Sequence, residues 1–359
     1  MSLRAPVSVS VSVSLSVSVL SALLLATAAP AQERFTLTGR DVAIYNLAGT
    51  MHITTGSGNA TEVEVTRVGK DANQLRVATG TIDGSNTLRV IYPADDIIYP
   101  SKKGHDSQTN MRVNDDGTFG RGRAGRRVSL STCPRGGRDA LEMGADLVVR
   151  VPAGVTLLAR LGVGQVEVRN VNGNITVDNS AGSITALGTR GELTLNTASG
   201  DIAVSNAEGD VNVSTASGGV RMEDVNARAV KVDVASGGIE VEDVRAPRVD
   251  LETASGQIRV RALESARVKL STASGAIEAD LTGKLENADI ETASGFINVR
   301  VPRGVDATLD VETASGSIDV DLPIKITTQR RNELRGTLGA GTGRISLSTA
   351  SGSIKVDGM

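Results

Sequence analysis

Closely spaced carboxylates are the first residues in this sequence that could support chemistry. Glu240 and Glu242 are separated by one residue, and so are Asp319 and Asp321. An enzyme that cleaves polysaccharides needs two convergent acids, or a base with neutralising cations, and a groove that holds sugar. The acids of this chain are spread along alternating positions, and tryptophan for sugar stacking is absent. We therefore expect solvated carboxylates, with a polysaccharide-active β-helix enzyme, a lyase or hydrolase, as the alternative.

Histidine and cysteine are too scarce for the common catalytic and metal sites. The sequence contains His52, His105 and Cys133 as its only members of these two types. Triads built on histidine and His-rich metal sites are therefore poor candidates. The phosphate-binding pattern GxxxxGK[ST] is absent as well. We expect no catalytic residues, no cofactor and no metal.

A basic, glycine-rich segment could bind a charged ligand. Residues 101–127 include Arg121, Arg123, Arg126 and Arg127, which could hold an anionic envelope polymer through salt-sensitive contacts. The alternative is a disordered, solubilising loop, and in either case we predict a mobile excursion. The formal net charge of the whole chain is −3, which does not favour a nucleic-acid partner.

The N-terminal residues 1–31 have the pattern of a secretory signal peptide. Arg4 precedes an apolar, serine-rich stretch that ends at Ala29, Pro30 and Ala31. The apolar run is shorter than the ~20 residues that a membrane helix needs. We expect a chain that starts near Gln32, does not span a membrane, and is exported to the periplasm, the cell surface or the medium.

The positions of these groups depend on a repeat. The string TASG occurs seven times between Thr197 and Thr349, with alternating apolar residues on both sides. Leu195 and Ile202 should both face inward, yet their separation of seven residues is odd, so the chain must turn between them. Glycine suits such a corner, and Thr or Ser hydroxyls can bond to backbone groups one layer away. The predicted corner glycines are Gly182, Gly200, Gly218, Gly237, Gly256, Gly275, Gly295, Gly316 and Gly352.

Coils of two short strands and two corners predict an all-β fold. We expect a parallel β-solenoid, β-helix-like, with about ten coils, because no single coil can bury its apolar face alone. Residues 32–160 should form a less regular β-rich cap or degenerate coils, and residues 161–359 the regular solenoid with a second excursion at 323–344. An antiparallel sandwich is the alternative, but it has no reason to repeat one turn sequence.

Three stretches carry a family resemblance. They are "VPAGVTLLARLGVGQVEVRNVNGNITVDNSAGSITA", the following TASG-x-I-x-V units, and "LRGTLGAGTGRISLSTASGSIKV". From about residue 40 to residue 359 the chain resembles the bacterial putative-adhesin family of β-strand-repeat proteins, a domain of unknown function. The resemblance implies a secreted or envelope-associated, non-catalytic adhesin or scaffold, and no catalytic residues. A cell-surface glycan or another envelope component is the expected partner.

Overall fold

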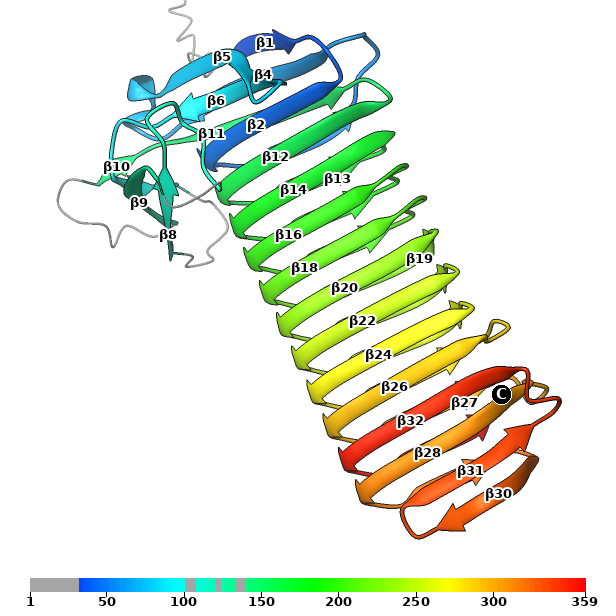
Figure 1. Cartoon of the computed structure of the whole chain (residues 1–359). Helices are drawn as coiled ribbons and strands as arrows, with labels where there is room; N and C mark the ends of the chain where they lie inside the picture. The colour runs from blue at the N-terminus through cyan, green and yellow to red at the C-terminus, as the bar shows by residue number, and fades with distance from the viewer. Residues whose placement is uncertain (1–31, 101–107, 121–123, 133–139) are drawn as a thin grey trace, which may run out of the picture.

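Two long sheets of stacked strands form the computed structural model, which describes residues 32–100, 108–120, 124–132 and 140–359 (Figure 1). We call the 14-stranded sheet A, the 15-stranded sheet B and the 4-stranded sheet C.

The strands of sheet B, in spatial order, are β30 (Ile324–Arg330), β31 (Glu333–Leu338), β28 (Ala307–Ser315), β32 (Gly343–Ser351), β26 (Asn287–Ser294), β24 (Arg267–Ser274), β22 (Arg248–Ser255), β20 (Ala229–Ser236), β18 (Val211–Ser217), β16 (Leu193–Ser199), β14 (Gly173–Ala181), β12 (Val155–Val163), β2 (Asp41–Ala48), β6 (Ser85–Ile91) and β5 (Arg76–Ile82).

The strands of sheet A, in spatial order, are β1 (Gln32–Leu37), β4 (Thr61–Val68), β11 (Gly144–Val151), β3 (Met51–Thr55), β13 (Val166–Arg169), β15 (Ile184–Leu187), β17 (Ile202–Ser205), β19 (Val220–Asn226), β21 (Ile239–Arg245), β23 (Ile258–Glu264), β25 (Ile277–Leu281), β27 (Ile297–Val301), β33 (Ile354–Gly358) and β29 (Ile318–Asp321). Sheet C contains β10 (Leu141–Glu142), β7 (Asp96–Ile98), β9 (Arg126–Ser131) and β8 (Gln108–Val113), and η1 (Ala72–Gln74) is a short 3-10 helix.

Each coil joins one strand of sheet B to one strand of sheet A. In the coil of β22 and β23, Val249 and Leu251 point inward from the first strand, and Ile258 and Val260 from the second. Neighbouring coils pair in parallel and in register, so that Leu251 lies beside Val232 and Leu270 in the sheet. The prediction of an all-β, parallel β-solenoid is confirmed.

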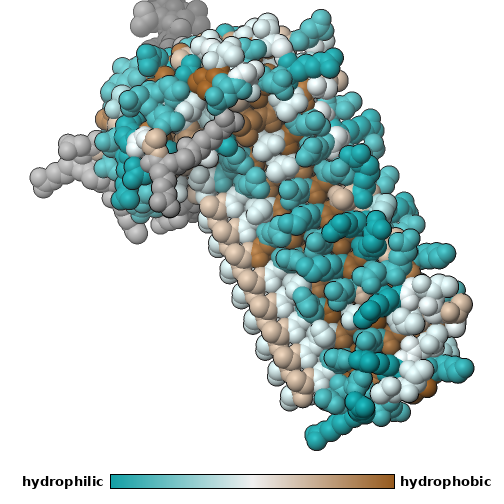
Figure 2. Space-filling view, in the orientation of Figure 1, coloured by the Kyte–Doolittle hydropathy of each residue, from teal (hydrophilic) through white to brown (hydrophobic). Residues whose placement is uncertain are grey.

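The TASG corner is closed by contacts between successive coils. The Thr253 hydroxyl is buried and donates a hydrogen bond of 3.0 Å to the carbonyl oxygen of Gly237, the corner glycine of the preceding coil. That carbonyl also points at the Cα of Gly256, so a Cβ there would lie 2.0 Å from the oxygen. The small Ala and Ser side chains of these corners form the pale row along one long edge of the solenoid in Figure 2.

The inward hydroxyl position is filled differently in some coils. Asn179 takes the place of threonine in β14 and donates to the carbonyls of Gly164 and Gly182. Val234 and Leu161 occupy the same position in β20 and β12 and have no hydroxyl to donate. The ladder of polar contacts is therefore interrupted, while the apolar layers continue through every coil.

Residues 32–160 supply both a coil and a cap. Strands β2 and β3 form a coil that stacks directly on β12 and β13, although residues 56–154 lie between the two coils in the sequence. Strand β11 pairs with β3 in parallel and with β4 in antiparallel orientation, and the β5–β6 hairpin covers the outer edge of β2. The end of the apolar core is thus closed by antiparallel strands.

The basic segment 101–127 differs from the predicted mobile excursion in its described part. Residues 108–113 form β8, and Arg126 begins β9, which pairs with it in antiparallel orientation. The physical reason is a short apolar alternation: Val113 of β8 and Val128 and Leu130 of β9 are buried. Arg160 of β12 donates to the carbonyl of Phe119, which forms an isolated β-bridge with Val113 of β8, and lies 5.8 Å from the Tyr45 ring centroid.

The second excursion, residues 323–344, is also built of strands. β30 and β31 form an antiparallel hairpin, and β31 pairs with β28. The hairpin covers the far end of sheet B, where a coil edge would otherwise have exposed its hydrogen-bonding groups. The segment therefore acts as a second cap.

Glu64 holds three strands of the N-terminal cap together. It lies on β4 with its side chain 9% exposed, 2.9 Å from Arg150 of β11 and 3.0 Å from Arg34 of β1. The hydrogen bond from Arg150 lowers the pKa of this carboxyl from its ordinary value. Because the folded pKa is depressed, the contribution of Glu64 to stability is present above the unfolded pKa of about 4.3 and is lost as the pH falls through the folded pKa.

We expect Glu64→Gln to lower the free energy of unfolding near pH 7 and to bring it close to the parent value at acidic pH. Urea unfolding at a series of pH values measures this difference. Glu192→Gln is the control, because the Glu192 side chain is exposed and makes no ion pair among the described residues. A Glu64→Gln difference that stays constant with pH would contradict the assignment.

Candidate binding surface

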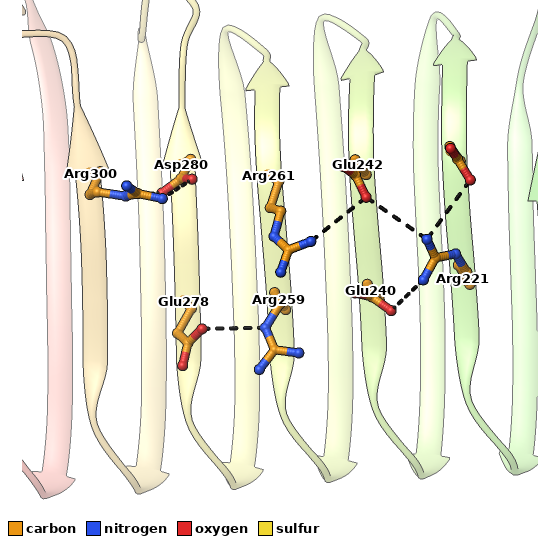
Figure 3. Close-up of polar contacts among 9 residues, drawn as sticks. Arg221, Glu240, Glu242, Arg259, Arg261, Glu278, Asp280 and Arg300 are labelled. Carbon is orange, nitrogen blue, oxygen red and sulfur yellow. Dashed lines mark hydrogen bonds and ion pairs between the residues drawn. The ribbon is translucent and has the colours of Figure 1, made fainter. Parts of the chain in front are cut away.

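Outward side chains of sheet A form columns in which opposite charges alternate. Arg221, Glu240, Arg259 and Glu278 occupy the same position in successive coils. Arg221 Nη1 lies 2.9 Å from Glu240 Oε2, and Arg259 Nε lies 3.3 Å from Glu278 Oε2 (Figure 3). Cross-strand pairs of opposite charge favour this register, although each exposed pair contributes little to stability.

A second column runs beside the first. Arg261 Nη1 lies 3.8 Å from Glu242, which also lies 3.9 Å from Arg221 Nη2. Arg300 forms a two-pronged contact with Asp280, as Figure 3 shows, and the hydrogen bond to Asp280 raises the pKa of the Arg300 guanidinium. Each cation in these columns faces a carboxylate. This part of sheet A therefore presents hydrogen-bond donors and acceptors, but no strongly positive or negative electrostatic potential.

A furrow interrupts the row of residues that follows the corner glycines. This row contains Ser183 and Asp201 in earlier coils and Gln257 and Ala276 in later ones, but Gly219 and Gly238 stand in the two coils between. The depression has a volume of about 450 Å³, and its rim includes Arg221, Arg259, Glu240, Gln257 and Asp201. Its floor is backbone and small side chains.

Gly219 and Gly238 are not required by the backbone. A Cβ built at Gly219 would have its closest contact at 3.6 Å, and one at Gly238 at 3.4 Å, both ordinary van der Waals distances. By contrast, the corner glycine Gly218 would place a Cβ 2.2 Å from the carbonyl oxygen of Gly200. Glycine in a strand region sacrifices conformational entropy relative to alanine. No steric contact in the structure therefore requires glycine at Gly219 and Gly238, which we call the two open rungs.

The furrow adjoins a larger depression toward the N-terminal cap. That depression has a volume of about 840 Å³ and shares Asp201 with the furrow. Its lining includes His52, whose Nδ1 lies 2.9 Å from Glu167 Oε2, and the hydrogen bond from Arg169 lowers the pKa of Glu167. Its lining also includes Pro100 and Thr132, each followed by residues outside the described ranges. Together the two depressions follow the corner edge of sheet A along the solenoid axis.

The structure places the acids suggested by the sequence on outer strand faces. Glu240 and Glu242 both contact Arg221 and project from β21 away from the core (Figure 3). Asp319 and Asp321 lie on β29 at the other end of the solenoid, so the two pairs do not converge. Within the described ranges, no group of His, Cys, Asp and Glu side chains is arranged to hold a metal ion.

The predicted anion-binding arginines have different environments. Arg126 donates to the backbone carbonyls of Tyr92 and Ala94 and pairs with Asp95, so it holds sheet C to the cap. Arg127 is exposed, lies opposite Arg112 in the β8–β9 pair, and makes no side-chain hydrogen bond or ion pair with the described part of the chain.

Other sequence predictions lie outside the described residues. These are Arg121, Arg123, His105, Cys133 and the signal peptide at 1–31. The predicted corner glycines, from Gly182 to Gly352, all stand at turns where a Cβ would approach the carbonyl of a neighbouring coil's corner glycine. No helix in the described ranges is long and apolar enough to cross a membrane.

The fold and its repeated corner define a parallel β-solenoid of the strand-repeat class. The model of the Toastrack DUF4097 family matches residues 145–357, which is more than half of the chain, and the protein belongs to this family of unknown function. The family resemblance stated from the sequence is therefore confirmed. Among curated proteins, none matches the chain.

Solved structures show similarity at low sequence identity. A putative adhesin from Parabacteroides distasonis is 10% identical, with a TM-score of 0.44, over 91% of this chain and 96% of that one. A putative lipid binding protein from the same species is 15% identical, with a TM-score of 0.41, over 92% and 97%. A putative adhesin from Bacteroides fragilis is 12% identical, with a TM-score of 0.35, over 91% and 96%. No conclusion about function follows from similarity at this level.

Proposed function

We propose that this protein is a non-catalytic adhesin or scaffold of the cell envelope that holds a linear, uncharged glycan along the corner edge of sheet A. The observation that carries the proposal is the pair of open rungs at Gly219 and Gly238, where the backbone accepts a side chain and the sequence supplies none. Export rests on the sequence of residues 1–31.

The shape of the furrow favours a linear polymer. It runs along the solenoid axis, and each coil adds a rung about 4.8 Å further on. Solenoids commonly bind extended ligands along such surfaces, because every rung repeats similar groups at a fixed spacing. A polymer with a short repeat could therefore make similar contacts on successive rungs.

The chemistry of the rim favours hydroxyl groups over charges. Arg221 and Arg259 supply donors, and Glu240 and Asp201 supply acceptors, with the cations already paired to carboxylates. A sugar can use both kinds of group through its hydroxyls, while its C–H face lies on the narrow floor of glycine backbone and Ala203. A strongly charged polymer would instead be repelled by the rim groups of its own sign, since both arginines and carboxylates line the furrow.

We also propose that the protein does not cleave the glycan. The ion pairs of the nearby carboxylates and the lowered pKa of one of them support this proposal. Glu240 and Glu242 are held by the same arginine, and the pKa of Glu167 is lowered, whereas a general acid needs a raised pKa. A glycosidase also needs two acids on opposite sides of one bond. The alternative, a polysaccharide-active enzyme, would require such a pair elsewhere in the chain.

A second binding function is favoured by the pair of arginines on sheet C. Arg112 and Arg127 lie directly opposite each other in antiparallel strands, an arrangement that is destabilising for like charges. An anionic polymer bound there would offset the repulsion through salt-sensitive contacts. This proposal retains Arg127 from the sequence prediction and adds Arg112, which lies in β8.

Filling the two open rungs tests the glycan proposal. The variant Gly219→Gln/Gly238→Gln places in both rungs the side chain that the next coil carries at Gln257, and the backbone has room for it. Calorimetric titration with a glycan that the parent retains should show at least a tenfold weaker affinity, without a change in melting temperature. Ala276→Gln is the matched control, because it adds the same side chain one coil beyond Gln257. Equal affinities of parent and filled variant would contradict the furrow as the site.

A further inference from the structure

The order of the coils departs from the order of the sequence at one end of the solenoid. Strand β32 lies between β26 and β28 in sheet B, and β33 lies between β27 and β29 in sheet A. In Figure 1 the red β32 separates the yellow-orange β26 from the orange β28. Residues 343–358 therefore occupy a slot whose two walls are formed by residues that precede them in the chain.

Both walls of the slot make the contacts that join ordinary coils. Thr349 Oγ1 donates to the carbonyl of Gly295 on one side at 3.2 Å, and Thr313 Oγ1 donates to the carbonyl of Gly352 on the other at 3.0 Å. The backbone follows the same pattern, with Gly295 N–H donating to Ser351. The slot therefore recognises a coil by its backbone and its TASG corner.

A short segment carries the chain into the slot. Residues 339–342, with the sequence GAGT, cross the start of β28 from the β31 side to the β32 side. Asp306 holds this crossing: its Oδ1 accepts the Ala340 N–H at 2.8 Å, and its carbonyl accepts the Gly343 N–H at 2.9 Å. These two hydrogen bonds to Asp306 hold residues 339–342 in place, and we call this segment the hinge.

The slot presents two strand edges to solvent whenever residues 343–358 are outside it. β26 and β28 then face each other about two strand spacings apart, near 9.6 Å, with hydrogen-bonding groups free on both sides. Exposed edges of this kind pair with any chain of matching pattern. The segment of a second copy has the same sequence and fits the same register.

We propose that the slot between coils β26–β27 and β28–β29 accepts residues 343–358 of a second copy of this chain, giving a domain-swapped assembly. The contacts within the slot are the same in the swapped and unswapped forms, and only residues 339–342 change their path. Such an assembly joins two solenoids at their C-terminal coils and doubles the number of furrows that can engage one polymer. This inference does not depend on what the furrow binds.

A disulfide between two chains tests the exchange. Ser294 and Ser351 are neighbours in register, at a spacing of about 4.8 Å that a disulfide can bridge. Two differently tagged full chains, both with Cys133→Ser, are produced together in one cell, one with Ser294→Cys and the other with Ser351→Cys. After tandem purification and mild oxidation, a non-reducing gel shows the disulfide-linked heterodimer.

The control replaces Ser294→Cys by Ser274→Cys. Ser274 is exposed, as Ser294 is, and pairs with Ser294, so it lies two coils away from Ser351 in either form. Chance contacts between surfaces would link both combinations alike, whereas exchange should give at least tenfold more heterodimer with Ser294→Cys. Equal yields from the two combinations, or no heterodimer from either, would overturn the proposal.

Discussion

Replacing Gly256 by alanine is expected to lower the free energy of unfolding by about 2–6 kcal/mol, since an overpacked site and a strained backbone each cost about 1–3 kcal/mol. The added Cβ would lie 2.0 Å from the carbonyl oxygen and 2.5 Å from the carbonyl carbon of Gly237. Both atoms belong to a backbone fixed by the Gly237 N–H bond to Ser255, so neither can move without shifting a coil. The φ angle of +156° adds strain.

Gly238→Ala is the matched control for this prediction. Gly238 follows directly after the corner glycine of the preceding coil, but its Cβ would meet its nearest neighbour, the Gln257 carbonyl oxygen, at 3.4 Å. Alanine there should be neutral or stabilising, because it reduces the entropy of the unfolded chain. Urea unfolding with amide exchange measures both variants. Equal stabilities for the two would refute the steric account of the corner.

Damage at Gly256 should spread along the solenoid. Each coil depends on its neighbours for hydrogen bonds and for apolar contact, so loss of one interface weakens protection on both sides. We expect amide exchange to accelerate first in β20 to β25, with the capped ends protected longer. Acceleration confined to the ends would indicate fraying that is independent of this corner.

Tyr92→Phe is expected to cost about 1–3 kcal/mol, the usual penalty for a buried polar group that loses its partner. The Tyr92 hydroxyl is buried, donates to Asn46 Oδ1 at 2.7 Å, and accepts the Ala48 N–H at 3.2 Å. Asn46 in turn donates to the Ala145 carbonyl at 2.7 Å. Burial raises the pKa of Tyr92 well above its ordinary value, so the hydroxyl remains a donor.

Tyr45→Phe serves as the control for Tyr92. Tyr45 is also buried, lies in β2, and packs edge-on against Phe119, but its hydroxyl makes no hydrogen bond within the described ranges. The comparison of melting temperatures separates loss of the hydrogen bonds from loss of ring packing. If both variants lost the same stability, the hydrogen bonds of the Tyr92 hydroxyl to Asn46 and Ala48 would not be the cause of the loss.

The repeat made the solenoid predictable from sequence. Leu195 and Ile202 are separated by an odd number of residues, and only a turn lets both face the core, so one spacing fixed the coil and the place of its corner. The corner sequence also predicts a hydrogen bond from a threonine hydroxyl to the backbone of the neighbouring layer, which Thr253 makes with Gly237. These features were readable because they depend on residues close together in the sequence and are repeated.

Features that join distant residues were not predictable in the same way. The position of β32 between β26 and β28 leaves no trace in its sequence, because all three strands end in the same TASG corner. The mobile excursion predicted for residues 101–127 includes β8 and the start of β9, because the arginines and glycines around Val113 obscure a short alternation. The open rungs at Gly219 and Gly238 are visible in the sequence, because an extra glycine directly follows the corner glycine in two successive coils.

The proposed function requires that the protein holds a glycan without cleaving it. The most direct measurement incubates the purified chain with a panel of envelope glycans, including an anionic polymer, and follows retention and released oligosaccharide in parallel. We predict retention of an uncharged linear glycan, salt-sensitive retention of the anionic polymer that weakens in Arg127→Gln, and no release of oligosaccharide. Release that disappears when a single carboxylate, such as Glu240, is changed to its amide would contradict the account and identify an enzyme.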